Sequence, residues 1–172
     1  MNRDQALEEL KLRLFDTHML FRSLVVEAIM EELARHFNAD TYLWGLTGLL
    51  HDIDYDKTLD QPELHGITGA EILENLDVDE SVAYSVRAHN DKNSIPRKRK
   101  MDKALYLSDY VVENIIKCCS EQKLTVPEIT AEVVLQSMAA DGLHLDKFAE
   151  LGVREHEFIE LALKAFEKVT ES

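Results

Sequence analysis

Apolar residues recur at helical spacings along almost the whole chain, and the alternating pattern of a half-buried β-strand is essentially absent. The clearest stretch is residues 17–37, where Ala, Glu, Leu and Met dominate and no glycine or proline interrupts. Further helices are expected around Leu7, Leu10 and Leu14, from an N-cap at Asp40 through Leu50, from Pro62 through Leu73, from Asp79 or Ser81 to about His89, and over residues 101–119, 127–140 and 155–169. The predicted fold class is all-α.

Polar connections separate these helices at residues 54–62 and 91–99, and Gly142 and Gly152 bracket a short, less regular piece. A chain of 172 residues fits one domain, which should bury roughly 70% of the surface that its unfolded form exposes. The composition, 45% hydrophobic and 30% charged, is that of an ordinary globular protein. A hydrophobic core can therefore form without disulfides.

The chain is acidic, with a formal net charge of −14. This argues against broad contact with duplex nucleic acid, because cationic side chains must displace counterions there. A small phosphorylated substrate remains compatible, since a bound divalent cation can invert the local field. The basic run Arg97-Lys98-Arg99-Lys100 is interpreted as a solvated loop and helix start, with attraction of phosphate as the alternative.

The two cysteines, Cys118 and Cys119, are adjacent. Neighbouring cysteines rarely satisfy disulfide geometry, so a reducing compartment is expected. The first residues lack the apolar core of a secretory signal, and no apolar run approaches the ~20 residues that span a bilayer. These features predict a cytoplasmic protein that makes no membrane contact.

His51 and Asp52 directly follow an apolar helix, and more carboxylates come after them. Imidazole nitrogen and carboxylate oxygen together suit divalent transition metals such as Mn, Fe, Co, Ni or Zn. At the end of a buried helix they would be held rigidly in a partly dry site. Taken alone, the pair is equally consistent with a helix C-terminus beside solvated acids.

Three later residues strengthen the metal interpretation. His65 lies beside small residues, His89 ends a predicted helix, and Asp109 interrupts an apolar helical face, where an unpaired acid would be costly. His51, Asp52, His65, His89 and Asp109 are therefore expected to converge on a site for a divalent metal ion. His36 and His156 are expected at the surface, and His144 is expected in a loop without a role.

The order His51-Asp52, His65, His89 and Asp109 resembles the HD-domain family of metal-dependent phosphohydrolases, especially small stand-alone members with two added histidines. The resemblance implies an HD-domain-like helical bundle over residues 1–172, with the metal-site core at about 17–120 and C-terminal helices at about 126–170. It also implies that His51, Asp52 and Asp109 are the core metal ligands. His65 and His89 would bind a second ion, and Asp52 would bridge the two.

One position departs from the family pattern. The first family ligand is a histidine on the second helix, and Arg22 stands at the matching position. A guanidinium stays protonated and cannot bind a cation. His18 lies four residues earlier, about 6 Å along the helix axis, and is an alternative ligand. The favoured interpretation is that the first metal position is weakened and that Arg22 pairs with an anion or a carboxylate there.

The resemblance implies hydrolysis of a small phosphate ester, of which a nucleotide is one candidate. Asp52 is the expected catalytic residue, and Arg22 or Lys57 could bind the phosphate. Asp54 and Asp56 could transfer a proton, although a solvated loop is the favoured interpretation of both. A second interpretation is a degenerate domain that binds a nucleotide or a protein partner without hydrolysis, and a third is a purely structural helical module.

Overall fold

A computed structural model describes residues 1–143 and 145–171. Within these ranges all regular secondary structure is helical. His144, predicted to lie in a loop, and Ser172 are outside the described residues. The all-α prediction is confirmed. The helices are α1 (Arg3–Lys11), α2 (Thr17–His36), α3 (Thr41–Leu50), α4 (Ile67–Asn75), α5 (Glu80–His89), α6 (Lys100–Gln122), α7 (Ala131–Ala140), α8 (Asp146–Leu151) and α9 (Glu155–Thr170), with short 3₁₀ turns η1 (Asp56–Thr58), η2 (Asp91–Asn93) and η3 (Val126–Glu128).

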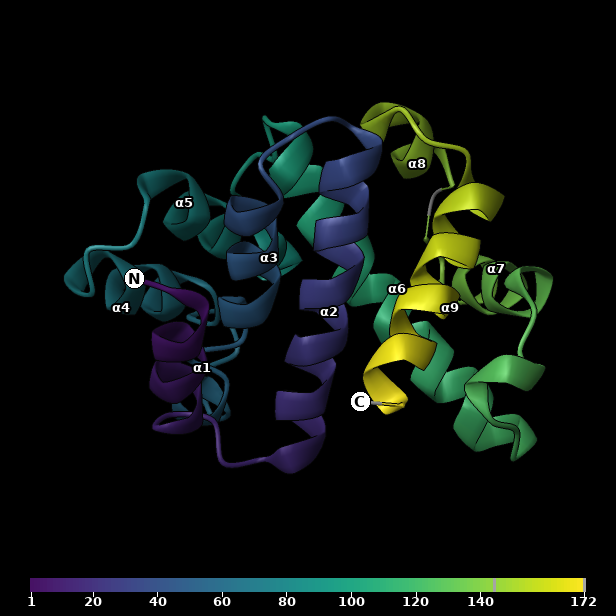
Figure 1. Ribbon diagram of the computed structural model, residues 1–172, viewed down its shortest axis with the longest axis horizontal. Helices are drawn as coiled ribbons and strands as arrows, with labels where there is room; N and C mark the ends of the chain where they lie inside the picture. Colours follow the sequence, from purple (N-terminus) through teal and green to yellow (C-terminus); the bar gives the residue numbers. More distant parts are fainter. Residues whose placement is uncertain (144, 172) are drawn as a thin grey trace.

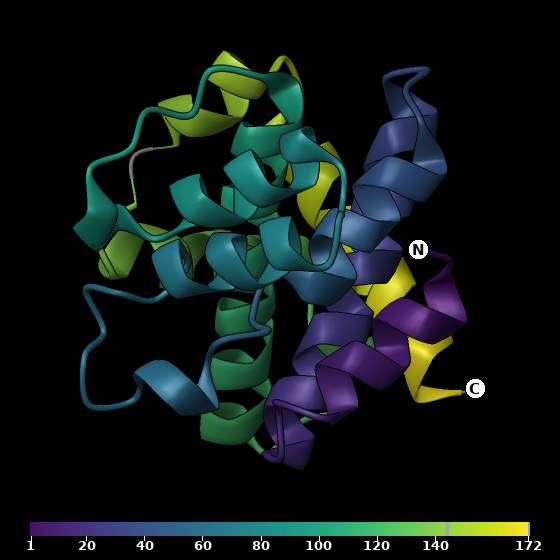
Figure 2. The same cartoon turned by 90° about the vertical axis from the view of Figure 1, so that its left-hand side faces the viewer.

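Helix α2 runs through the middle of the molecule, with α1, α3, α4 and α5 on one side and α7, α8 and α9 on the other (Figure 1). It packs against α3, α6 and α9. Figure 2 shows α4 and α5 lying side by side on the face of the molecule that carries the N-terminal helices. No helix within the described ranges is long and apolar enough to cross a membrane.

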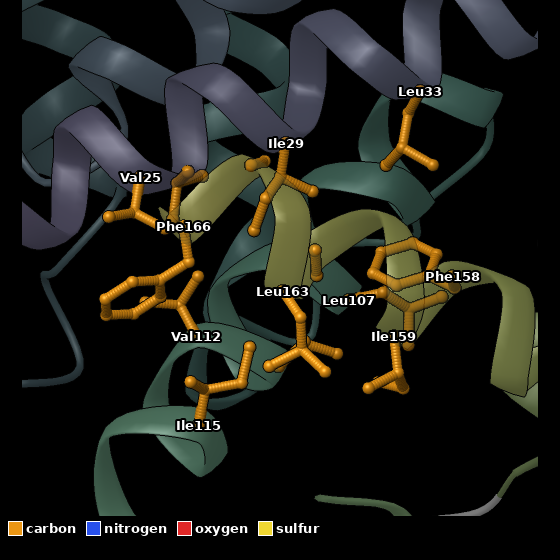
Figure 3. Packing of buried hydrophobic residues seen from close by; sticks show 14 of the residues in the cluster. Val25, Ile29, Leu33, Leu107, Val112, Ile115, Phe158, Ile159, Leu163 and Phe166 are labelled. Atoms are coloured by element: carbon orange, nitrogen blue, oxygen red, sulfur yellow. The ribbon is translucent and has the colours of Figure 1, made fainter. Parts of the chain in front are cut away.

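Two clusters of buried apolar side chains lie on either side of α2 and α3. The larger joins α2 and α6 to the C-terminal helices, and each fully buried side chain of this size contributes about 1.5–3 kcal/mol. The smaller joins α1, α3, α4 and α5. Figure 3 shows part of the larger cluster: Val25, Ile29 and Leu33 from α2, Leu107, Val112 and Ile115 from α6, and Phe158, Ile159, Leu163 and Phe166 from α9.

The predicted N-caps are confirmed where acids begin helices. The Asp40 carboxylate accepts the Leu43 N–H at the start of α3, and the Asp79 carboxylate accepts the Ser81 N–H at the start of α5. These contacts satisfy amide groups that have no partner within the helix.

The prediction of a helix from Pro62 is wrong, because α4 begins at Ile67. The Gly66 N–H donates to the Asp54 carboxylate instead of the Pro62 carbonyl, and Gly66 has a φ of +84° that a helix interior cannot accommodate. Other boundaries also differ. The helix predicted from residue 127 starts at Ala131, after η3, and the piece between Gly142 and Gly152 contains α8.

Candidate metal centre

Five polar residues that are far apart in sequence lie together where several helices end. His51 caps the C-terminus of α3, Asp52 follows it, His65 precedes α4, His89 ends α5, and Asp109 lies within α6. His51, Asp52 and His89 are buried, whereas the side chains of His65 and Asp109 are 18% and 19% exposed. The structure thus brings together all the residues that the sequence singled out as metal ligands.

Asp52 links two groups of potential ligands. Its Oδ2 lies 3.1 Å from His51 Nε2, and its Oδ1 lies 3.2 Å from His65 Nε2. The first group is completed by Asp109 and the second by His89, with the ligand atoms of each group within 4.8 Å of one another. Asp52 Oδ2 is buried and accepts no hydrogen bond among the described residues, because its close contact with His51 Nε2 lacks hydrogen-bond geometry. A buried carboxylate oxygen left in this way is suited to a cation.

His51 and His89 are oriented by the same local contact. His51 Nδ1 lies 2.7 Å from the Gly48 carbonyl, and His89 Nδ1 lies 2.6 Å from the Val86 carbonyl. In both cases the ring folds back on a carbonyl of the last turn, which has no partner within the helix. Because a carbonyl only accepts, Nδ1 must carry the proton, and Nε2 is directed into the site.

His65 is oriented by Asp54. His65 Nδ1 lies 2.9 Å from Asp54 Oδ1, while Asp54 Oδ2 accepts the N–H groups of Gly66 at 2.8 Å and Gly69 at 2.7 Å. A carboxylate–histidine pair of this kind commonly fixes the ring of a metal ligand. Asp54 is fully buried, so its interpretation as part of a solvated loop is wrong. Asp56 accepts the Phe15 N–H instead of facing the site.

The surroundings of the three site histidines shift their pKa values in opposite directions. Burial opposes protonation of His51, but the carboxylates of Asp52 and Asp109 outweigh it and raise the pKa to about 10. Burial likewise opposes protonation of His65, but Asp52 and Asp54 raise its pKa to about 9. The pKa of His89 falls to about 4, because burial and two neighbouring imidazoles disfavour a further charge.

Arg22 enters the site from α2. Its Nε and Nη2 donate to Asp109 Oδ1 at 2.9 and 2.5 Å, and Nη2 also lies 3.8 Å from Glu113 Oε2. Although burial favours the neutral acid, this guanidinium holds the pKa of Asp109 well below its usual range. The expected pairing of Arg22 with a carboxylate of the site is observed. His18 is exposed on the first turn of α2 and does not line the cavity above the site.

A cavity of about 320 Å³ opens above this cluster. Lys92 and Arg22 are the lysine and arginine in its lining, whereas Lys57, suggested from the sequence, is exposed in η1 and does not line it. Lys92 carried no signal in the sequence beyond its position three residues after His89. The other residues that line the cavity are Met19, Asp52, Tyr55, His65, His89, Asn90, Asp91, Tyr106, Asp109 and Tyr110.

Comparison with protein-family models gives a match over residues 20–146 to the model described as the HD domain. The matched range contains every residue of the two ligand groups as well as Arg22 and Lys92. No curated protein matches the chain.

Proposed function

The chain belongs to the HD-domain family, and on this basis we propose that it is a metal-dependent phosphohydrolase that acts on a small phosphate ester. The main observation that supports this proposal is the convergence of three imidazoles and two carboxylates at the base of a cavity. Each imidazole has its Nδ1 bound to an acceptor, so each presents Nε2 to the same small volume.

The donor set fits a divalent cation. His51, Asp52, His65, His89 and Asp109 are the residues that would hold one or two ions, and the partnerless Asp52 Oδ2 supports this. When bound, the cation supplies positive charge that neutralises the phosphate and makes water more acidic. Mn, Fe, Co, Ni, Zn and Mg are the metals to be compared.

The chain's own groups would bind and orient the ester. Lys92 and Arg22 line the cavity and supply positive charge for a phosphate, although two of the Arg22 nitrogens already donate to Asp109. Asp52 is the proposed catalytic residue, because its buried carboxylate faces ligands on both sides and can orient the reacting groups. The substrate is a small phosphorylated molecule, with a nucleotide as one candidate, and not duplex nucleic acid.

The Arg22–Asp109 ion pair favours one alternative, a degenerate domain that binds a nucleotide or a protein partner without hydrolysis. In that case the guanidinium would permanently replace a metal position. Retention of four further buried or nearly buried ligands argues for the enzyme, since burying polar groups costs free energy and a domain that no longer bound metal would have no need of them.

A turnover assay separates the two functions. Metal-depleted protein is supplied with each metal in turn and tested for phosphate release from nucleoside monophosphates and p-nitrophenyl phosphate. We expect turnover that Asp52→Asn lowers by at least about 100-fold, which corresponds to a loss of ~2.7 kcal/mol of transition-state stabilisation. Asp60→Asn, an exposed loop acid, is the matched control. Nucleotide binding without any turnover would favour the degenerate domain.

A further inference from the structure

The two ligand groups of the site do not offer equal positions for a cation. The first consists of His51, Asp52 and Asp109, and the second of Asp52, His65 and His89. They share Asp52 but use different oxygens of it, so either group could bind an ion without the other.

A protein cation already takes part in the first group. Arg22 Nη2 and Nε lie 2.5 and 2.9 Å from Asp109 Oδ1, the same oxygen that lies 3.1 Å from His51 Nε2. A guanidinium keeps its proton at any ordinary pH. A divalent ion on this oxygen would therefore face a fixed positive charge at short range.

The second group has no such competitor. No lysine or arginine of the described residues forms an ion pair with Asp52, His65 or His89, and the Arg22 charge acts on the shared Asp52 only without direct contact. His89 Nε2 and His65 Nε2 lie 3.1 Å apart, and the Nδ1 atoms of both rings lie within hydrogen-bond distance of acceptors. Two nitrogen lone pairs at this distance repel each other unless a proton or a cation lies between them.

Access to the cavity also differs between the groups. Asp52, His65 and His89 all line it, whereas in the first group Asp52 and Asp109 line it and His51, which is fully buried, does not. An ion held by the second group would therefore keep open positions toward the cavity. Two imidazoles and one carboxylate form a donor set that suits divalent iron, manganese, cobalt and zinc.

We propose that the chain binds a single divalent transition metal through Asp52, His65 and His89, and that the Arg22 guanidinium takes the place of a metal ion in the first group. The inference deepens the proposed function, on which it rests for the biological purpose of the ion. Its test, however, measures metal binding without any substrate, so a failure to hydrolyse phosphate esters would leave it standing.

His51 and His89 provide a matched pair for this test. Both rings are buried, both end a helix, and both contact a carbonyl three residues earlier. Metal-free protein is titrated with Co²⁺, and binding is followed by visible absorption and by calorimetry. We expect one ion per parent chain, a loss of affinity of tenfold or more in His89→Gln, and near-parental affinity in His51→Gln.

Arg22→His provides the second arm, which does not depend on how well the glutamine variants fold. Removing the guanidinium and adding an imidazole should allow a second Co²⁺ to bind, so the stoichiometry should rise from one to two. Two ions in the parent, or an affinity that falls in His51→Gln but not in His89→Gln, would overturn the proposal. Circular dichroism of each variant confirms that the helices have formed.

Discussion

The three imidazoles of the site differ in how readily they hold a second proton. In the metal-free protein the pKa of His65 is raised to about 9, whereas that of His89 is lowered to about 4. At neutral pH, His65 therefore carries a proton on Nε2 that a metal ion must displace, and His89 does not. Metal binding by this group should release one proton.

Metal affinity should consequently depend on pH. Because the raised pKa of His65 keeps its proton bound below about pH 9, lowering the pH strengthens the competing proton. We expect the affinity for Co²⁺ to fall about tenfold for each unit of pH below that value. Titrations at pH 6, 7 and 8 check this slope, and calorimetry in buffers of different ionisation enthalpy counts the protons. A flat profile would contradict a role for His65 as a ligand.

Asp54 determines which nitrogen of His65 faces the site. In Asp54→Asn the amide oxygen can still accept the N–H groups of Gly66 and Gly69, but its NH₂ group would then face His65 Nδ1. The ring should move its proton to Nε2 and present a donor to the metal. We expect a loss of metal affinity of roughly 10- to 100-fold.

The tautomer of His65 can be read from its nitrogen chemical shifts by NMR, which a merely structural defect would not invert. Asp56→Asn removes the same charge from the same loop and contacts the Phe15 N–H instead of an imidazole. It should therefore bind metal like the parent. Parental affinity in Asp54→Asn would show that the carboxylate does not position His65.

At the scale of the helices, Gly48 determines how closely α3 approaches α2. A Cβ at Gly48 would lie 2.8 Å from the Glu27 backbone and the Val26 carbonyl, so α3 would have to move and carry His51 with it. We expect Gly48→Ala to lower the free energy of unfolding by about 1–3 kcal/mol, measured by urea denaturation.

Gly45, one turn earlier on α3, is the control for this prediction. A Cβ there would meet the Glu31 side chain, at 2.9 Å from its Cγ, and a flexible, partly exposed side chain can move away. Gly45→Ala should be neutral or stabilise by up to ~1 kcal/mol, because alanine favours the helix. Equal destabilisation by both substitutions would contradict close packing specific to Gly48.

The sequence predicted helices best where the helical pattern of apolar residues continues without interruption. Helices α2, α3, α5 and α6 were all expected close to their observed positions, because each carries a continuous buried face. The start of α4 was missed, since it depends on Asp54 capturing two amides from another segment. Local patterns contain no information about such a contact. Lys92 was missed for the same reason, as its place in the cavity comes from the packing of α5 against α6.

The site residues were predictable to a different extent. His51, Asp52 and Asp109 stand out because polar groups on apolar helices need partners. The pairing of Arg22 with a carboxylate followed from its position on α2. The orienting role of Gly48 and Val86 carbonyls could not be predicted, because it depends on the ring geometry at each helix end.

At the scale of the whole molecule, two connections cross the site. The Arg22–Asp109 ion pair joins α2 to α6, two helices that the larger apolar cluster also connects. The Asp52–His65–His89 group instead joins the end of α3 to α4 and α5, whose apolar residues form the smaller cluster. An ion bound by this group should therefore stabilise mainly the smaller cluster, while the ion pair already supports the larger one without metal.

Metal should accordingly raise the melting temperature in a way that depends on Asp52 and not on Asp109. An ion at 100 times its Kd stabilises the folded state by about 2.7 kcal/mol, which for a domain of this size is a rise in Tm of roughly 5–10 °C. Asp52→Ala should abolish the rise, because both oxygens that face the ligand groups are removed. Asp109→Asn should lower the starting Tm by removing the charge that pairs with Arg22, yet keep the rise. Differential scanning calorimetry with and without excess Co²⁺ measures both quantities. An unchanged Tm of the parent protein in the presence of metal would contradict a tightly held ion. Loss of the rise in Asp109→Asn would place the ion in the group that Arg22 contacts.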